Sequence, residues 1–190
     1  MGESYSCPSG GVIAGGRRRF AHNALLDRIA AAPDNSWLQI NDNTYESVWP
    51  AKAFRPMWGA AEHEPRKIIA SLSSFAWDDS RLCFYLFGGG HASTNGNEVY
   101  RFSAVTGQWD LAFHSADVQP LLADDGITSA GEVPKPGALS APQSCHTYAT
   151  SIYLPHLDRA AIFGGACSPT GGPSRANGPD RTLGPFLLDT

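Results

Sequence analysis

The sequence is poor in charge and has no long hydrophobic run. Charged residues make up 17% of its 190 residues, below the roughly 25% that is usual in soluble domains. The 14 basic side chains are outnumbered by 18 acidic ones, which gives a net charge of −4. A nucleic-acid-binding surface needs clustered cations, so we expect no nucleic-acid partner. No segment approaches the roughly 20 apolar residues of a membrane-spanning helix, so we expect no membrane span.

Turn-forming and aromatic residues are abundant instead. The chain contains 20 Gly and 14 Pro, and aromatic residues make up 11%. With 42% hydrophobic residues it can bury a core, and its length suits about one domain. Frequent Gly and Pro between short apolar segments favour short strands joined by turns. The composition therefore predicts an all-β protein.

The N-terminal region has two interpretations. Residues 17–20, Arg-Arg-Arg-Phe, match the start of a twin-arginine export signal, but His22 and Asp27 interrupt the apolar segment that should follow. The alternative is a short amphipathic helix over about 19–32. We assign residues 1–33 to a tail with this short helix. The lack of a clear signal peptide favours the cytoplasm, and export stays an open alternative.

The most informative feature is an internal repeat. Residues 73–89 align without gaps with residues 149–165, which lie 76 positions later. Each segment reads as a short strand, an aromatic residue, a four-residue polar turn, an apolar strand and the sequence Phe-Gly-Gly. Two strands that flank a turn predict a β-hairpin in each segment.

The first hairpin continues into two further predicted strands, over residues 97–102 and 109–113. Four antiparallel strands within about 45 residues are typical of one propeller blade. In the second unit, residues 186–190 align with residues 100–104 and predict a third strand.

A further strand is expected upstream of the first hairpin. Residues 34–40 resemble residues 106–112, which are a turn followed by a strand that begins with Trp. This similarity predicts a strand led by Trp37. The chain then holds the last strand of one blade, one complete blade and three strands of another.

The glycine and aromatic positions of the repeat resemble the kelch family, in which a hydrophobic strand ends in a double Gly and is followed by a Tyr and a Trp. The matching residues are Gly88, Gly89, Tyr100 and Trp109 in the first unit and Gly164 and Gly165 in the second. Phe186 stands at the Tyr position of the second unit. The double Gly allows positive φ and close backbone approach.

This resemblance implies a partial kelch-type β-propeller over residues 34–190. It consists of a blade over 68–113, a long loop over 114–144 and an incomplete blade over 145–190. The resemblance also implies a fragment of a closed propeller, because a propeller needs about 4–8 blades. We expect blade edges left exposed in such a fragment to promote self-association.

A candidate site follows from the loops of such a fold. In a propeller, the loop between strands two and three and the loop into strand one emerge on the same face, where variable loops carry function. The candidate ligand-binding residues on this face are Arg55, His91, Asn95, Asn97 and His146, with His63 nearby. Such side chains hydrogen-bond a sugar, a peptide or a carboxylate. The alternative is that His91 and His146 only bind backbone carbonyls of neighbouring loops. The 114–144 loop is expected to be a surface excursion that covers this face or is simply mobile.

The cysteines suggest one pairing. Cys145 and Cys167 lie at nearly equal distances from the turn of the second hairpin, so we expect them to be cross-strand neighbours that form a disulfide in an oxidising compartment. The alternative is a metal site that adds His91 and His146. Cys145 and His146 are adjacent on a strand and point to opposite faces, which disfavours a metal site that uses both. We therefore expect no metal and no cofactor. Cys83 is expected to be a small buried hydrophobic residue.

These features favour a non-catalytic binding module that recognises a protein, a peptide or a glycan. One alternative is a fragment of a propeller enzyme, either glycan-active or similar to galactose oxidase, whose copper centre needs a Tyr, His and Cys-linked Tyr set that we cannot assign here. Another is a truncated product without independent activity. The sequence has no Gly-rich phosphate loop and no Ser nucleophile elbow.

Overall fold

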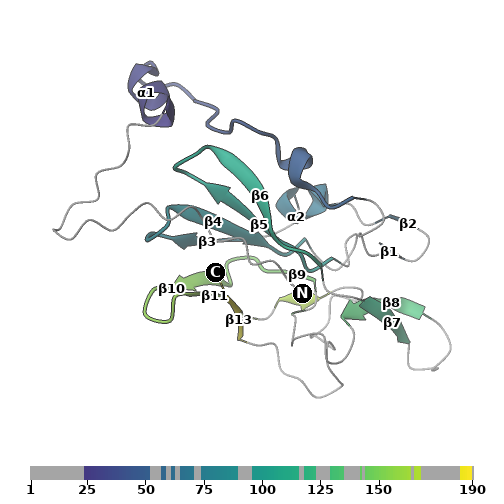
Figure 1. Ribbon diagram of the computed structural model, residues 1–190. Coiled ribbons are helices and arrows are strands. Elements are labelled where there is room, and N and C mark those ends of the chain that lie inside the picture. Colours follow the sequence, from purple (N-terminus) through teal and green to yellow (C-terminus); the bar gives the residue numbers. More distant parts are fainter. Residues whose placement is uncertain are drawn as a thin grey trace.

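Most of the regular structure in the computed structural model is antiparallel β-sheet (Figure 1). The helices are short: α1 (Ala24–Ala31), the 3-10 helix η1 (Tyr45–Val48) and α2 (Arg66–Ala70). The all-β class is therefore confirmed. Among the residues that the structure describes, no helix combines the length and the hydropathy that crossing a bilayer requires. The described residues are 24–51, 57–58, 61–62, 65–70, 74–89, 96–115, 118–122, 129–134, 142, 144–163, 165–167 and 185–189.

The largest sheet has four strands in chain order, and we call it the first sheet. It consists of β3 (Ser74–Asp78), β4 (Cys83–Phe87), β5 (Val99–Ser103) and β6 (Gln108–Phe113). All neighbours pair antiparallel. The four strands predicted for the first repeat unit are thus confirmed. Cys83 is fully buried, as expected.

The second sheet contains the other repeat unit. It is made of β10 (Ser151–Leu154), β11 (Arg159–Ile162) and β13 (Phe186–Asp189), in that order and all antiparallel.

Its strand register reproduces that of the first sheet. Phe84 pairs with Phe102, and their aligned counterparts Ala160 and Leu188 pair with each other. The two hairpin turns also match, because Leu82 and its counterpart Asp158 both have positive φ, at 55° and 54°. The repeat inferred from the sequence is therefore a repeat of backbone structure.

The double glycines have the predicted backbone. Gly88, Gly89 and Gly165 have φ of 129°, 108° and 123°, a region that other L-residues rarely adopt. A Cβ at position 165 would collide with the carbonyl oxygen of His146, so this position requires close backbone approach as well. Gly164 lies outside the described residues.

The 114–144 stretch was expected to be a loop, and this is wrong. It contains an antiparallel hairpin of β7 (Val118–Leu122) and β8 (Ser129–Pro134). Pro120 and Gly131 inside these strands argue against a strand when the sequence is considered locally. Pairing between the two segments nevertheless supplies the ladder, with an irregularity between Leu121 and Leu122.

Two shorter antiparallel pairs complete the described strands. β1 (Met57–Trp58) pairs with β2 (Ala61–Glu62), and β9 (Cys145–His146) pairs with β12 (Ala166–Cys167). The second pair lies in the repeat unit of the second sheet, but it forms a sheet of its own.

The strand predicted to start at Trp37 does not form. Residues 36–43 have no strand assignment, and the Trp37 side chain is fully exposed. Arg28 holds this segment by donating to the carbonyl oxygen of Gln39 at 2.5 Å and to Asp42 Oδ1 at 2.6 Å. One backbone bond, from the Asp42 amide to the Gly107 carbonyl, joins it to the β5–β6 turn. A single backbone bond does not make a ladder. The Asn43 side chain adds two bonds to the backbone of Trp109, accepting from its amide at 2.7 Å and donating to its carbonyl at 2.9 Å, and the segment runs past the first sheet without adding a strand.

The predicted N-terminal helix is present in the described part of its span. Within the described residues α1 covers Ala24–Ala31, and residues 19–23 lie outside them. It buries Leu25, whereas Ile29 is half-exposed. The chain leaves the helix through Asn35, whose φ of 58° marks a turn.

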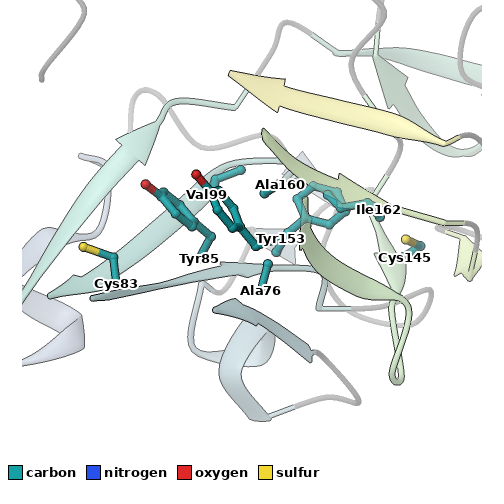
Figure 2. Close-up of a cluster of buried hydrophobic side chains, with 9 residues drawn as sticks. Ala76, Cys83, Tyr85, Val99, Cys145, Tyr153, Ala160 and Ile162 are labelled. Atoms are coloured by element: carbon teal, nitrogen blue, oxygen red, sulfur yellow. The ribbon is translucent and has the colours of Figure 1, made fainter. Parts of the chain in front are cut away.

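The core lies between the two sheets. One face of the first sheet contributes Ala76, Tyr85 and Val99, and the second sheet contributes Tyr153 and Ile162 (Figure 2). A second cluster covers the opposite face of the first sheet, where Tyr45 from η1 and Ile68 from α2 pack on Leu86 and Tyr100. The first sheet is therefore the middle layer, with η1 and α2 on one side and the second sheet on the other.

Candidate functional site

Several segments meet at one end of the first sheet. Thr147 Oγ1 donates to the Phe87 carbonyl at 3.4 Å, and Ser144 Oγ donates to the Gly88 carbonyl at 3.5 Å. The Ser74 amide donates to Thr147 Oγ1 at 2.8 Å. Residues 144–147, which lead towards the second sheet, are thus fixed against the end of β4 and the start of β3. We call this end the loop edge; it consists of residues 74, 87–88, 97–98 and 144–148.

Asn97 joins three segments at the loop edge. Its Nδ2 donates to the Pro142 carbonyl at 2.9 Å, and its Oδ1 accepts from Ser115 Oγ at 2.9 Å. Its backbone amide donates to the same Ser115 hydroxyl at 3.2 Å. Only 6% of Asn97 is exposed. This candidate ligand residue therefore holds the start of β5 to two neighbouring segments.

His146 is also mostly buried, with 8% of its surface exposed. Its ring packs edge-on against Tyr148, with ring centroids 5.7 Å apart. Tyr148 is half-exposed and has a φ of 50°. Tyr148 is thus the large side chain that the loop edge presents to solvent. The sequence reasoning missed it, although an aromatic residue in a polar turn two positions after His146 was a usable signal.

The other candidate ligand residues lie outside the described part of the chain; these are Arg55, His63, His91 and Asn95. For the cysteines, the register of β9 and β12 places the Cα of Cys145 opposite that of Cys167. This agrees with the expected cross-strand position. The disulfide itself stays a prediction, which a free-thiol count with and without reductant tests. Among the described residues, no group of three or more His, Cys, Asp or Glu side chains is arranged to hold a metal ion.

A buried carboxylate lies beside Asn97. Glu98 is 1% exposed, and its Oε1 accepts from the Tyr100 hydroxyl at 3.2 Å. Burial, and then the charge of Glu98, raise the pKa of Tyr100 far above 10.0. The same two causes raise the pKa of Tyr45, whose hydroxyl donates to the Pro65 carbonyl at 2.9 Å. Both phenols therefore stay protonated and act as hydrogen-bond donors within the core.

The burial of Glu98 could not be expected from the sequence alone. A glutamate next to a strand is normally solvent-exposed. In the folded chain, the hydrogen bond from the Tyr100 hydroxyl offsets part of the cost of burying Glu98. The pair contributes to the packing of the loop edge rather than to its exposed surface.

A second polar cluster lies at the opposite end of the sheets, and we call it the turn clamp. Arg81 Nη1 donates to Asp78 Oδ2 and to Asp158 Oδ1, both at 2.7 Å, and to the Tyr153 hydroxyl at 2.9 Å. Hydrogen bonds from Arg81, and then from Tyr153, hold the pKa of Asp158 well below its usual range. Because Asp78 and Arg81 belong to the first hairpin and Tyr153 and Asp158 to the second, the clamp joins the two sheets.

Comparison with known proteins adds no relative to this description. No family model, no curated protein and no solved structure matches the chain. The resemblance to the kelch family thus depends on the residues of the repeat, and the family assignment stays a prediction.

Proposed function

We propose that this chain is a kelch-type β-propeller module that binds a protein, a peptide or a glycan at the loop edge without catalysing a reaction. The observation that carries the proposal is the attachment of residues 144–147 to the end of β4. Through it, connections from two successive repeat units leave the sheets at the same edge. Loops gathered on a rigid scaffold are a common way to build a binding surface.

The contact between the sheets supports the propeller part of the proposal. β3 and β10, the first strands of the two units, lie next to each other, and the Ser151 amide donates to Ser74 Oγ at 3.2 Å. Propeller blades surround a central channel, so the first strands of neighbouring blades are expected to approach most closely near the axis.

The exposed chemistry of the loop edge suits an uncharged polar ligand. Tyr148 offers a half-exposed ring, and His146 lies directly behind it. An aromatic ring beside hydrogen-bonding groups can stack on a sugar or on a peptide side chain. Arg55, His91 and Asn95 lie outside the described residues and stay candidate ligand contacts from the sequence.

A glycan and peptide array tests this assignment. The wild type is compared with His91→Ala, His146→Ala and Tyr148→Ala, and we expect each to weaken binding at least about tenfold. His156→Ala is the matched control, because His156 is exposed in the turn at the opposite end of the second sheet. Its binding profile should equal that of the wild type.

Two results would contradict the proposal. One is that the wild type binds nothing on either array. The other is that Tyr148→Ala and His156→Ala give the same profile as the wild type. Thermal melts of all variants show whether a lost signal reflects binding or folding, and the half-exposed Tyr148 is the position at which replacement should least disturb the fold.

A further inference from the structure

The outer faces of the two sheets carry exposed hydrophobic side chains. On the first sheet, the face turned away from the second sheet exposes 41% of Phe75 and 37% of Trp77. Both rings pack on Phe84, with centroid distances of 5.4 Å and 4.5 Å. We call these three residues the aromatic face. They cover the part of this surface that η1 and α2 leave open.

The second sheet exposes a complementary surface. On its side turned away from the first sheet, Ile152 is 50% and Leu187 is 54% exposed. Both are register partners of Ala161, so the three residues share one face. We call them the aliphatic face.

These two exposed faces are repeat equivalents of the two faces that already pack together. Inside the chain, Ala76 and Tyr85 of the first sheet share a core with Tyr153 and Ala160 of the second. Over the repeat of 76 positions, Tyr153 corresponds to Trp77 and Ala76 corresponds to Ile152. The aromatic face is thus the repeat equivalent of the face that the second sheet packs against the first. The aliphatic face is the repeat equivalent of the face that the first sheet packs against the second.

One pair of positions keeps its combination of side-chain sizes in the two exposed faces. In the internal contact, the large Tyr85 lies on the first sheet and the small Ala160 on the second. The counterparts are Ala161, which is small, and Phe84, which is large. One large and one small residue thus occupy this pair of positions in both cases, whereas Ala76 and Tyr153 are replaced by the two larger residues Ile152 and Trp77.

The residues of the turn clamp have apolar counterparts at the repeat-equivalent positions. Inside the chain, Arg81 binds the Tyr153 hydroxyl. The counterpart of Arg81 is Leu157, which is 47% exposed, and the counterpart of Tyr153 is Trp77. Both members of the pair are apolar, so neither would leave a buried charge when the two faces meet.

We propose that a second copy of this chain docks head to tail, with the aromatic face of one copy on the aliphatic face of the next. The contact repeats the internal contact between the two sheets. It joins two different surfaces, so it leaves one aromatic face and one aliphatic face open at the ends and can continue into a ring or a chain. It requires no ligand and does not depend on the binding function proposed above.

Sedimentation velocity over about two decades of protein concentration tests the proposal. We expect wild-type particles larger than one chain, whose mean mass rises with concentration. Trp77→Glu and Ile152→Glu should each weaken this association at least about tenfold, because each places a charge in one of the two faces. The matched control is Ile29→Glu on α1, since Ile29 is 50% exposed, as is Ile152; it should associate as the wild type does.

A mixture of the two variants identifies the geometry. Trp77→Glu keeps its aliphatic face and Ile152→Glu keeps its aromatic face, so an equimolar mixture should form a dimer and stop there. A wild type that stays monomeric at every concentration would overturn the proposal, and so would variants that associate normally or a mixture that stays monomeric. If either variant fails to give a cooperative thermal melt, Phe75→Glu or Leu187→Glu replaces it on the same face.

Discussion

The two sheets share one strand register but differ in what covers them. Tyr100 in β5 is fully buried beneath Tyr45, whereas Phe186, at the same register position in β13, is only half-buried. The hairpins and their turns set the register locally, so it is the same in both units. Burial instead depends on what packs on each face. η1 and α2 cover Tyr100, whereas Phe186 is the register partner of Ile162 and lies on the face that the first sheet covers in part.

The largest expected effect on stability is at Tyr100, where the two sheets differ in burial. Tyr100→Ala removes a fully buried ring and the hydrogen bond to Glu98, so we expect it to lower the free energy of unfolding by about 3–5 kcal/mol. Phe186→Ala, its counterpart, should cost only about 1 kcal/mol. Urea denaturation of both variants measures the difference. Equal losses would show that the covering segments do not stabilise the first sheet more than the second.

A smaller effect is expected from the bond between the sheets. Arg81→Ala leaves the buried Asp78 without its cationic partner, so we expect a loss of about 1–3 kcal/mol. Arg159→Ala is the control, because Arg159 pairs at 3.0 Å with the exposed Asp189 within the second sheet. Such a surface pair is worth less than about 1 kcal/mol. Urea denaturation measures both losses. An equal loss of unfolding free energy in Arg159→Ala and Arg81→Ala would contradict this expectation.

The smallest effect is a pH dependence of the same clamp. Burial acts to raise the pKa of Asp78, but hydrogen bonds from Ser80 and Arg81 outweigh it and lower the pKa below 3.8. The folded-state pKa is thus below the unfolded one, so this carboxylate stabilises the fold at pH above about 4 and its contribution is lost as the pH falls through the folded value.

The free energy of unfolding should therefore decrease on acidification below about pH 4. Denaturation curves at neutral and acidic pH for the wild type and Asp78→Asn measure this. The wild type should lose more stability than the variant, which has no carboxylate at position 78. Identical losses in the two proteins would contradict the assignment to this side chain.

The predictable part of the structure consists of local features. Turn residues and apolar segments predicted both hairpins, and the glycines at 88, 89 and 165 have the expected positive φ. The β7–β8 hairpin was missed because Pro120 and Gly131 oppose strands in local reasoning. The strand at Trp37 was predicted from similarity to another segment, but one backbone hydrogen bond, from Asp42 to Gly107, joins this segment to the first sheet and no ladder forms.

The candidate site was less predictable for a physical reason. Asn97 and His146 were selected for their polar chemistry, yet both are buried, and Asn97 is bonded to Ser115 and Pro142, which are distant in sequence. Tyr148 is exposed only because of how residues 144–148 turn at the loop edge. Exposure is a property of the assembled surface, and a linear pattern carries little information about it.

The sequence by itself determined the strand pairing within the two repeat hairpins, since a hairpin closes over a few residues and each strand alternates its side chains between two faces. Only the tertiary structure decided which of those faces are covered. It placed Arg81 against Asp158, buried Glu98 behind Tyr100, and left Trp77 and Ile152 open on opposite sides. The reason is that covering a sheet face requires contacts between residues far apart in the chain, and these form only when the sheets pack together.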